Sequence, residues 1–207
     1  MTHKPLLLAL VLTLAAFSRL SAEDPGTPSI VIEPPAPASY TEDRPAYAFF
    51  KKIEVSPRSS GSYDVTITLQ ADIPTTFPKD RGLYVSMTID FAEISPEKSL
   101  NTNHIPHFNE DLVVSLNRNV GSPKFDPYAG TVEYHGRKWD FKVSSLIVRK
   151  DTITFTLRSP LFALHPPSKV VFRTNPMKAQ SPTQSSGIIG HETTPVVLDP
   201  GAATAPK

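Results

Sequence analysis

The sequence predicts an all-β protein: an antiparallel β-sandwich of about eight strands, with a partly closed β-barrel as the alternative. Three observations lead to this prediction. Between residues 47 and 174, apolar side chains recur at every second position, which is the period of a strand with one wet face. Turn signals separate these runs, and no stretch has a convincing helical period. No repeat of about 20 to 50 residues is present, which argues against solenoids and propellers.

The predicted strands follow one another along this region. In the clearest of them, residues 63–73, apolar side chains such as Ile67 alternate with polar ones such as Thr68. We therefore expect one face of this strand to be buried and the other to be wet. The other strands predicted from the same rhythm are 48–55, 83–91, 112–116, 130–134, 138–143, 146–149, 152–157 and 169–174.

Turns and one irregularity connect the later strands. His135-Gly136 predicts a tight hairpin turn, because glycine accepts the positive φ that such turns require. Lys150-Asp151 predicts a second hairpin. At Ser144-Ser145 the alternation slips by one residue, which indicates a β-bulge or a corner where the chain changes sheet.

The first segment has the parts of a secretory signal peptide. Lys4 supplies a positive start, residues 6–17 form an apolar run, and small residues precede an acidic pair. We expect residues 1–22 to be removed by cleavage near Ala22. The apolar run is shorter than the about 20 residues that a bilayer span needs. The sequence therefore predicts a secreted or periplasmic protein without a transmembrane span in the mature chain.

The flanks of the predicted domain differ from it in composition. Residues 23–46 are rich in proline and predict an extended linker, with one short strand at 30–32. Residues 47–174 carry the strand rhythm and form the predicted β-sandwich domain. Residues 175–207 are rich in Pro, Ser and Thr, and predict a disordered tail.

Composition excludes several classes of function. The chain has 21 Lys plus Arg against 20 Asp plus Glu, so it lacks the charge excess that nucleic-acid binding favours. Because it contains no cysteine, disulfides, thiolate nucleophiles and iron–sulfur clusters are excluded. The serine-hydrolase, phosphate-loop and dinucleotide-binding motifs are also absent. The sequence therefore predicts a protein that is not an enzyme.

A polar loop at residues 99–111 is a candidate metal site. His104 and His107 are two residues apart and could hold zinc together with a nearby carboxylate. Alternatively, Asp90 and Asp111 could converge on calcium with Asn109. Asp90 lies near the end of one predicted strand and Asp111 just before the next, so the two acids flank this loop. The third interpretation is a solvated loop in which Asn109 and Asp111 cap turns.

Aromatic side chains are the second candidate feature. Tyr84 and Trp139 could present rings on which a sugar stacks, because aromatic faces are large, rigid and amphipathic. Trp139 is in phase with Phe141 and Val143, which favours a position in the core. Tyr84 is out of phase with the apolar residues of its strand, which favours exposure.

Residues 82–160 resemble the bacterial sandwich domains of the DOMON and family 9 carbohydrate-binding type. The order that carries the resemblance is GLYVSMTIDF, a polar loop, FNEDLVVSL, YAGTVEYHG and SSLIVRKDTITFTLRSPLF. By this resemblance Asp90 matches the first acidic position and Asp111 the second, and Ser159-Pro160 match the end of the late strand. The resemblance implies a sandwich that binds sugar, or haem in its cytochrome members, and that sometimes carries structural calcium. For a haem ligand the mature chain offers only Met87, in core phase, and Met177.

These observations lead to one leading hypothesis and two alternatives. The leading hypothesis is an exported, non-catalytic β-sandwich module that binds a carbohydrate or another cell-surface component. The first alternative is a structural or assembly protein of the cell envelope that acts on an envelope protein through its tails. An enzyme of unrecognised type is the third.

Overall fold

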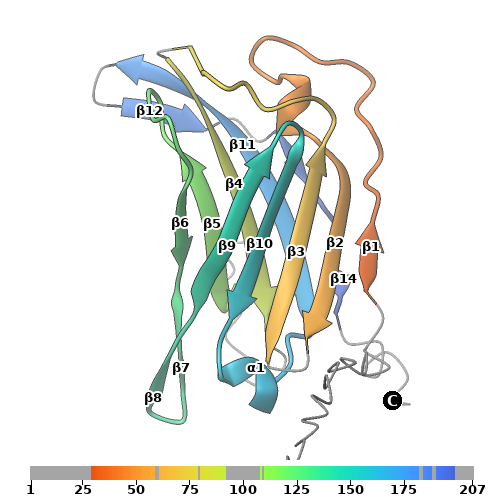
Figure 1. Cartoon of the computed structure of the whole chain (residues 1–207), viewed down its shortest axis with the longest axis vertical. Helices are drawn as coiled ribbons and strands as arrows, with labels where there is room; N and C mark the ends of the chain where they lie inside the picture. The colour runs from red at the N-terminus through yellow and green to blue at the C-terminus, as the bar shows by residue number, and fades with distance from the viewer. Residues whose placement is uncertain are drawn as a thin grey trace, which may run out of the picture.

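Figure 1 shows a computed structural model of the chain, which describes residues 29–58, 61–78, 80–91, 108, 110–181, 184–187 and 190–198. The predicted signal peptide, with its cleavage site near Ala22, lies outside the described residues. The same holds for three of the predicted metal ligands, His104, His107 and Asn109.

The described strands form two stacked antiparallel sheets, which we call sheet A and sheet B. Sheet A lies in front in Figure 1. Its strands, in spatial order, are β1 (Ile30–Ile32), β2 (Phe50–Arg58), β3 (Ser62–Leu69), β10 (Thr152–Arg158) and β9 (Lys142–Arg149). The short strand predicted at 30–32 is confirmed as β1, which pairs with β2.

Sheet B lies behind sheet A. Its strands, in spatial order, are β12 (Gln184–Gly187), β11 (Lys169–Ser181), β4 (Arg81–Asp90), β5 (Leu112–Arg118) and β6 (Asp126–Ala129). Two further short strands, β13 (His191–Glu192) and β14 (Val196–Val197), also pair with β11.

The remaining elements are small. Strands β7 (Thr131–Tyr134) and β8 (Arg137–Asp140) form a separate hairpin, and η1 (Ala46–Ala48) and α1 (Leu161–Leu164) are single helical turns. Among the described strands, none of sheet A pairs with a strand of sheet B, so the predicted sandwich is confirmed and the barrel alternative is not. Within the described part of the chain, no helix has the length and apolar character needed to cross a membrane.

The core lies between the two sheets, where the inward-facing side chains of both meet. Phe50 of β2 contacts Phe172 of β11 edge to face, with 6.3 Å between ring centroids. The predicted alternation in β3 is confirmed, because Val65, Ile67 and Leu69 are buried and the residues between them are partly exposed. The largest fully buried side chains are Phe49, Phe50, Phe91, Phe172, Ile53, Ile67, Leu69, Leu83, Met87, Ile89, Leu112 and Leu116.

The predicted turn and bulge are both confirmed. His135 and Gly136 connect β7 to β8 with φ values of 52° and 69°, the left-handed pair that a two-residue hairpin needs. In the pairing of β9 with β10, Phe155 alone lies opposite Ser145 and Leu146. This two-against-one arrangement is a β-bulge, and Ser145 has a φ of 53°. The bulge turns Leu146 toward the core side, where it packs against the buried cluster.

Strands continue past Thr174, the residue at which the sequence predicts that the domain ends. Strand β11 continues to Ser181, and residues 190–198 run along its outer edge. The amide of Gly190 donates to the carbonyl of Thr174 at 2.8 Å, and Leu198 is 5% exposed within the core cluster. A Cβ at Gly190 would lie 2.7 Å from the carbonyl oxygen of Ala48, so this docking requires glycine.

His191 makes the docking of this segment sensitive to pH. Its Nδ1 accepts a hydrogen bond from the amide of Phe50 at 3.2 Å, which only a nitrogen without a proton can do. Burial, and then the charge of Arg44, lower the pKa of His191 below its ordinary value of 6.5. The unfolded chain therefore takes up this proton more readily than the folded chain, and the folded state loses stability as pH falls below about 6.5.

We expect His191→Gln to remove this part of the pH dependence. Urea unfolding of both proteins at pH 7.5 and pH 5.0 measures the effect. The loss of unfolding free energy between the two pH values should be larger for the native chain than for the variant. Equal losses would show that the imidazole is not neutral in the fold.

Candidate functional site

Two grooves lie at opposite ends of β9, and basic side chains line both. The first, which we call the Trp139 groove, lies between β8, the start of β9, the end of β10 and the turn at Gly61. Its volume is about 590 Å³. Its lining side chains are Arg137, Lys138, Trp139, Asp140, Lys142, Arg158, Ser159 and Pro160, with Gly61. Four of these are basic and only Asp140 is acidic.

The strand register brings two of these cations together. Arg158 of β10 lies directly opposite Lys142 of β9, and both side chains are exposed. On the neighbouring strand β3, Ser62 lies opposite Arg158, and Arg58 of β2 lies opposite Ser62. Lys142, Arg158 and Arg58 therefore form a row of basic residues across this end of sheet A. Arg58 pairs with Asp64. Among the described residues, Lys142 and Arg158 have no acidic partner, and like charges directly opposite each other destabilise a sheet.

Trp139 forms the wall of the same groove. It is 8% exposed and belongs to the core cluster, as its phase with Phe141 indicates. The guanidinium of Arg137 lies over the indole ring, 4.0 Å from its centroid. This stacking holds a positive charge at the groove in a fixed place. The indole Nε1 is buried, and no hydrogen-bond partner for it lies among the described residues.

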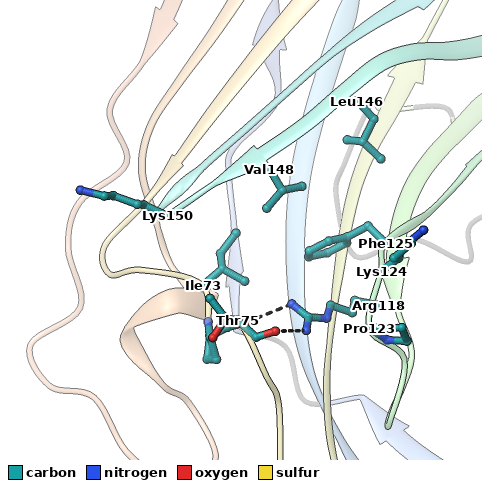
Figure 2. A pocket seen from close by; sticks show the side chains of 10 residues that line it. Ile73, Thr75, Arg118, Pro123, Lys124, Phe125, Leu146, Val148 and Lys150 are labelled. Carbon is teal, nitrogen blue, oxygen red and sulfur yellow. Dashed lines mark hydrogen bonds between the residues drawn. The ribbon is translucent and has the colours of Figure 1, made fainter.

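The second groove, which we call the Arg118 groove, lies at the end of the sandwich that carries the β9–β10 hairpin. Its volume is about 410 Å³. Figure 2 shows Leu146 and Val148 on one side, Phe125 and Ile73 across from them, and Arg118 at the base. The other lining residues are Pro74, Thr75, Pro123, Lys124 and Lys150. None of the described residues that line this groove is acidic.

Backbone carbonyl groups hold Arg118 in place. Its Nε donates to Ser122 at 3.1 Å, Nη1 to Pro74 at 3.0 Å and Nη2 to Thr75 at 2.8 Å. Its guanidinium carbon lies 4.5 Å from the ring centroid of Phe77 and 6.0 Å from that of Phe125. The residue is 5% exposed, and burial lowers the pKa of its guanidinium. No carboxylate among the described residues neutralises it.

A second buried arginine, Arg81, differs from Arg118 because it has carboxylate partners. Arg81 is also largely buried, but its Nη2 donates to Glu42 at 2.8 Å and its Nη1 to Asp43 at 3.1 Å. The hydrogen bond from Arg81 and the charge of Lys178 lower the pKa of Asp43. Within the described part of the chain, Arg81 is therefore neutralised by two carboxylates and Arg118 by none.

Tyr84 lies beside Leu83, the register partner of Arg118, but on the opposite face of sheet B. Its strand neighbours Leu83 and Val85 face the core, so Tyr84 lies on the outer face of sheet B, where it is partly exposed. Asn175 and Asn117 are its register partners on the two adjacent strands. Tyr84 and Trp139 therefore do not share one platform, although both remain candidate ligand contacts.

Asp90 and Asp111 are the two predicted metal ligands that the structure describes. Asp90 ends β4, and Asp111 directly precedes β5, the strand that pairs with β4. The carboxylate of Asp111 accepts a hydrogen bond at 2.7 Å from the amide of Phe91, which lies 20 positions earlier in the chain. Among the described residues, no three His, Asp or Glu side chains gather as a metal site requires. Because His104, His107 and Asn109 lie outside these residues, the zinc and calcium hypotheses stay predictions.

Sequence reasoning missed the basic lining of both grooves, but signals for it exist. Arg118 continues the even-numbered phase of Leu112, Val114 and Leu116, which places a cation on the core face of a strand. The stretch RKWDFK surrounds Trp139 with three basic residues. Arg158 could not be added from sequence alone, because only the strand register brings it opposite Lys142.

Comparison with protein-family models, with curated proteins and with solved structures found no match for this chain.

Proposed function

We propose that the chain is an exported, non-catalytic β-sandwich module that binds an anionic carbohydrate of a cell surface in the Trp139 groove. The observation that carries this proposal is the pair Arg158 and Lys142, two like charges directly opposite each other in an open groove. Such a pair lowers the stability of the sheet, and a bound anion relieves the repulsion. A carboxylate, phosphate or sulfate group on the ligand would supply that anion.

The shape and composition of the groove support a sugar polymer as the ligand. The four basic side chains are exposed and come from β8, β9 and β10, so they are spread along the groove. A row of cations suits a chain of repeating charges better than a single small anion. Ser159 and Asp140 add polar groups suited to hydroxyl groups. The resemblance to carbohydrate-binding sandwich domains supports the same ligand class.

Binding to one polysaccharide in three charge forms tests the proposal. Affinity electrophoresis of the mature chain in dextran sulfate, carboxymethyl dextran and neutral dextran compares ligands that share a backbone. We expect both anionic forms to retard the protein, with affinity that falls as salt rises from 50 to 200 mM, and neutral dextran to have little effect. Polyacrylate serves as a polyanion without sugar. Equal binding to polyacrylate would contradict recognition of carbohydrate, and no binding to either anionic dextran would contradict the site.

We expect the double variant Lys142→Ala, Arg158→Ala to bind the anionic dextrans about tenfold more weakly, since each exposed charge contact contributes about 0.5 to 1 kcal/mol. Its unfolding free energy should not fall, because the substitution removes a repulsion. Arg149→Ala is the matched control: Arg149 is also exposed and basic, but lies at the other end of β9. A loss of affinity as large for Arg149→Ala would show that general charge, and not this groove, governs binding.

The alternative is an envelope assembly protein that acts through residues 175–207. Deleting these residues cannot test it, because some of them belong to sheet B. Residues 175–181 are the second half of β11, and residues 190–198 pair with its first half. Removing the segment would take strands from sheet B. Point substitutions at exposed positions such as Val197, which is 42% exposed, probe that alternative without this loss.

A further inference from the structure

We infer that the Arg118 groove is a second binding site, which takes a small amphiphile with one carboxylate group and an unbranched apolar chain. The site is separate from the Trp139 groove, because the two lie at opposite ends of β9. The inference does not depend on the proposed function. It rests on the charge, the free donors and the apolar walls of this groove.

The guanidinium of Arg118 has hydrogen-bonding capacity left for a ligand. A guanidinium carries five N–H groups. Three of them, one on each nitrogen, donate to the carbonyls of Ser122, Pro74 and Thr75. One N–H therefore remains on each terminal nitrogen. Each of these N–H groups can donate a charge-assisted hydrogen bond to a carboxylate oxygen of a ligand.

The charge around the groove also favours a single anion. Lys124 and Lys150 line the groove as well, and neither has an acidic partner among the described residues. Figure 2 places these lysines at opposite margins of the view, with the ammonium group of Lys150 directed away from the guanidinium. Arg118 is thus the cation at the base, and a monoanion neutralises it. The lysines contribute a positive field at the rim.

Apolar side chains make the walls above this cation. Leu146, Val148, Phe125 and Ile73 converge on the space in Figure 2. Val148 is 37% exposed although it faces the core side of β9, because the groove opens beside it. A volume of about 410 Å³ is within the range of small-molecule sites, about 300 to 1,000 Å³. An apolar chain would cover these walls while its head group reaches Arg118.

Calorimetric titration with octanoate below its micellar concentration tests the inference. Three analogues isolate its parts: 1-octanol lacks the charge, octylammonium reverses it, and acetate lacks the chain. We expect octanoate to bind at one site, and each analogue to bind at least about tenfold more weakly, since a charged hydrogen-bonded contact or several buried methylene groups are lost. Amide shifts of Phe125 and Val148 should accompany octanoate binding.

Matched variants on one strand locate the site. Val148→Trp should fill the groove and weaken octanoate binding at least about tenfold. Ile147→Trp is the control, because Ile147 is 46% exposed on the opposite face of β9 and does not line the groove. It should leave the affinity within about twofold. Thermal unfolding confirms that both variants are folded.

Several outcomes would overturn the inference. Equal binding of 1-octanol would show an apolar surface that does not select charge. Equal binding of acetate or of inorganic phosphate would show a simple anion site. No octanoate binding at millimolar concentration, or equal effects of the two tryptophan variants, would show that Arg118 only ties the loops together.

Discussion

Replacing Arg118 by methionine is expected to lower the unfolding free energy by about 3 kcal/mol, because three charge-assisted hydrogen bonds are lost together. The carbonyls of Pro74 and Thr75 belong to the β3–β4 connection, and that of Ser122 belongs to the β5–β6 connection. Arg118 therefore joins the β3–β4 and β5–β6 connections through its side chain. Methionine fills much of the same volume but offers these carbonyls no donor. Urea unfolding followed by the fluorescence of Trp139, the chain's single tryptophan, measures the loss.

Two further variants separate the causes of this loss. Arg118→Lys keeps the charge but not the planar fork that reaches three carbonyls, so it should recover only part of the stability. Arg149→Met removes an exposed arginine from β9 and should change the unfolding free energy by no more than about 0.5 kcal/mol. If Arg118→Met costs less than about 1 kcal/mol, water satisfies the carbonyls and Arg118 does not hold the loops.

Local alternation was enough to predict the central strands. Strand β3 is buried on one face only, so apolar and polar residues alternate along its sequence with a period of two. The same signal located the bulge at Ser144-Ser145, because a one-residue slip reverses which side chains face the core. Edge strand β6 was missed. Its sequence, DPYA, has no apolar alternation, since it is largely exposed and has one hydrogen-bonded neighbour.

The C-terminal strands were missed for a different reason. Pro176 resembles a tail signal, because proline cannot donate to a ladder of strand hydrogen bonds. In the structure the pairing of β11 with β13 ends at Thr174, and its pairing with β12 begins at Met177. Pro176 falls in the interval between them, where its missing N–H costs little. The side chain of Thr193 adds a polar link to this segment, because its Oγ1 accepts a hydrogen bond from the amide of Phe172 at 3.0 Å.

The candidate sites were harder to predict than the fold, because they depend on residues that only the sheet register brings together. Arg158 and Lys142 are 16 positions apart in the chain, yet they face each other across a strand pair. Trp139 was proposed as a ligand contact only because its side chain is aromatic. Its phase correctly indicated a position in the core. Its place in a basic groove could not be predicted, because the end of β10 forms part of that groove. Periodicity reports which face a residue occupies, but not which distant residue shares that face.

Replacing Ile67 by alanine is expected to lower the unfolding free energy by about 2 to 5 kcal/mol, because a buried side chain is lost and a cavity remains. Ile67 is 1% exposed in the middle of β3, which is itself the middle strand of sheet A. Its register partners are Ile53 and Ile153, two more core side chains. Packing on both sides limits how far the site can collapse to fill the cavity, so the upper half of the range is expected.

The adjacent substitution Thr68→Ala is the matched control for the face of the strand. Thr68 is partly exposed, and its register partners are Thr152 and Lys52, on the outer face of sheet A. Its loss should cost no more than about 1 kcal/mol, mostly through strand propensity. Urea unfolding of the two variants against the native chain gives both values. Equal costs would mean that the outer face of sheet A is covered as fully as the core face, which would contradict the exposure of the basic row that the proposed carbohydrate site uses.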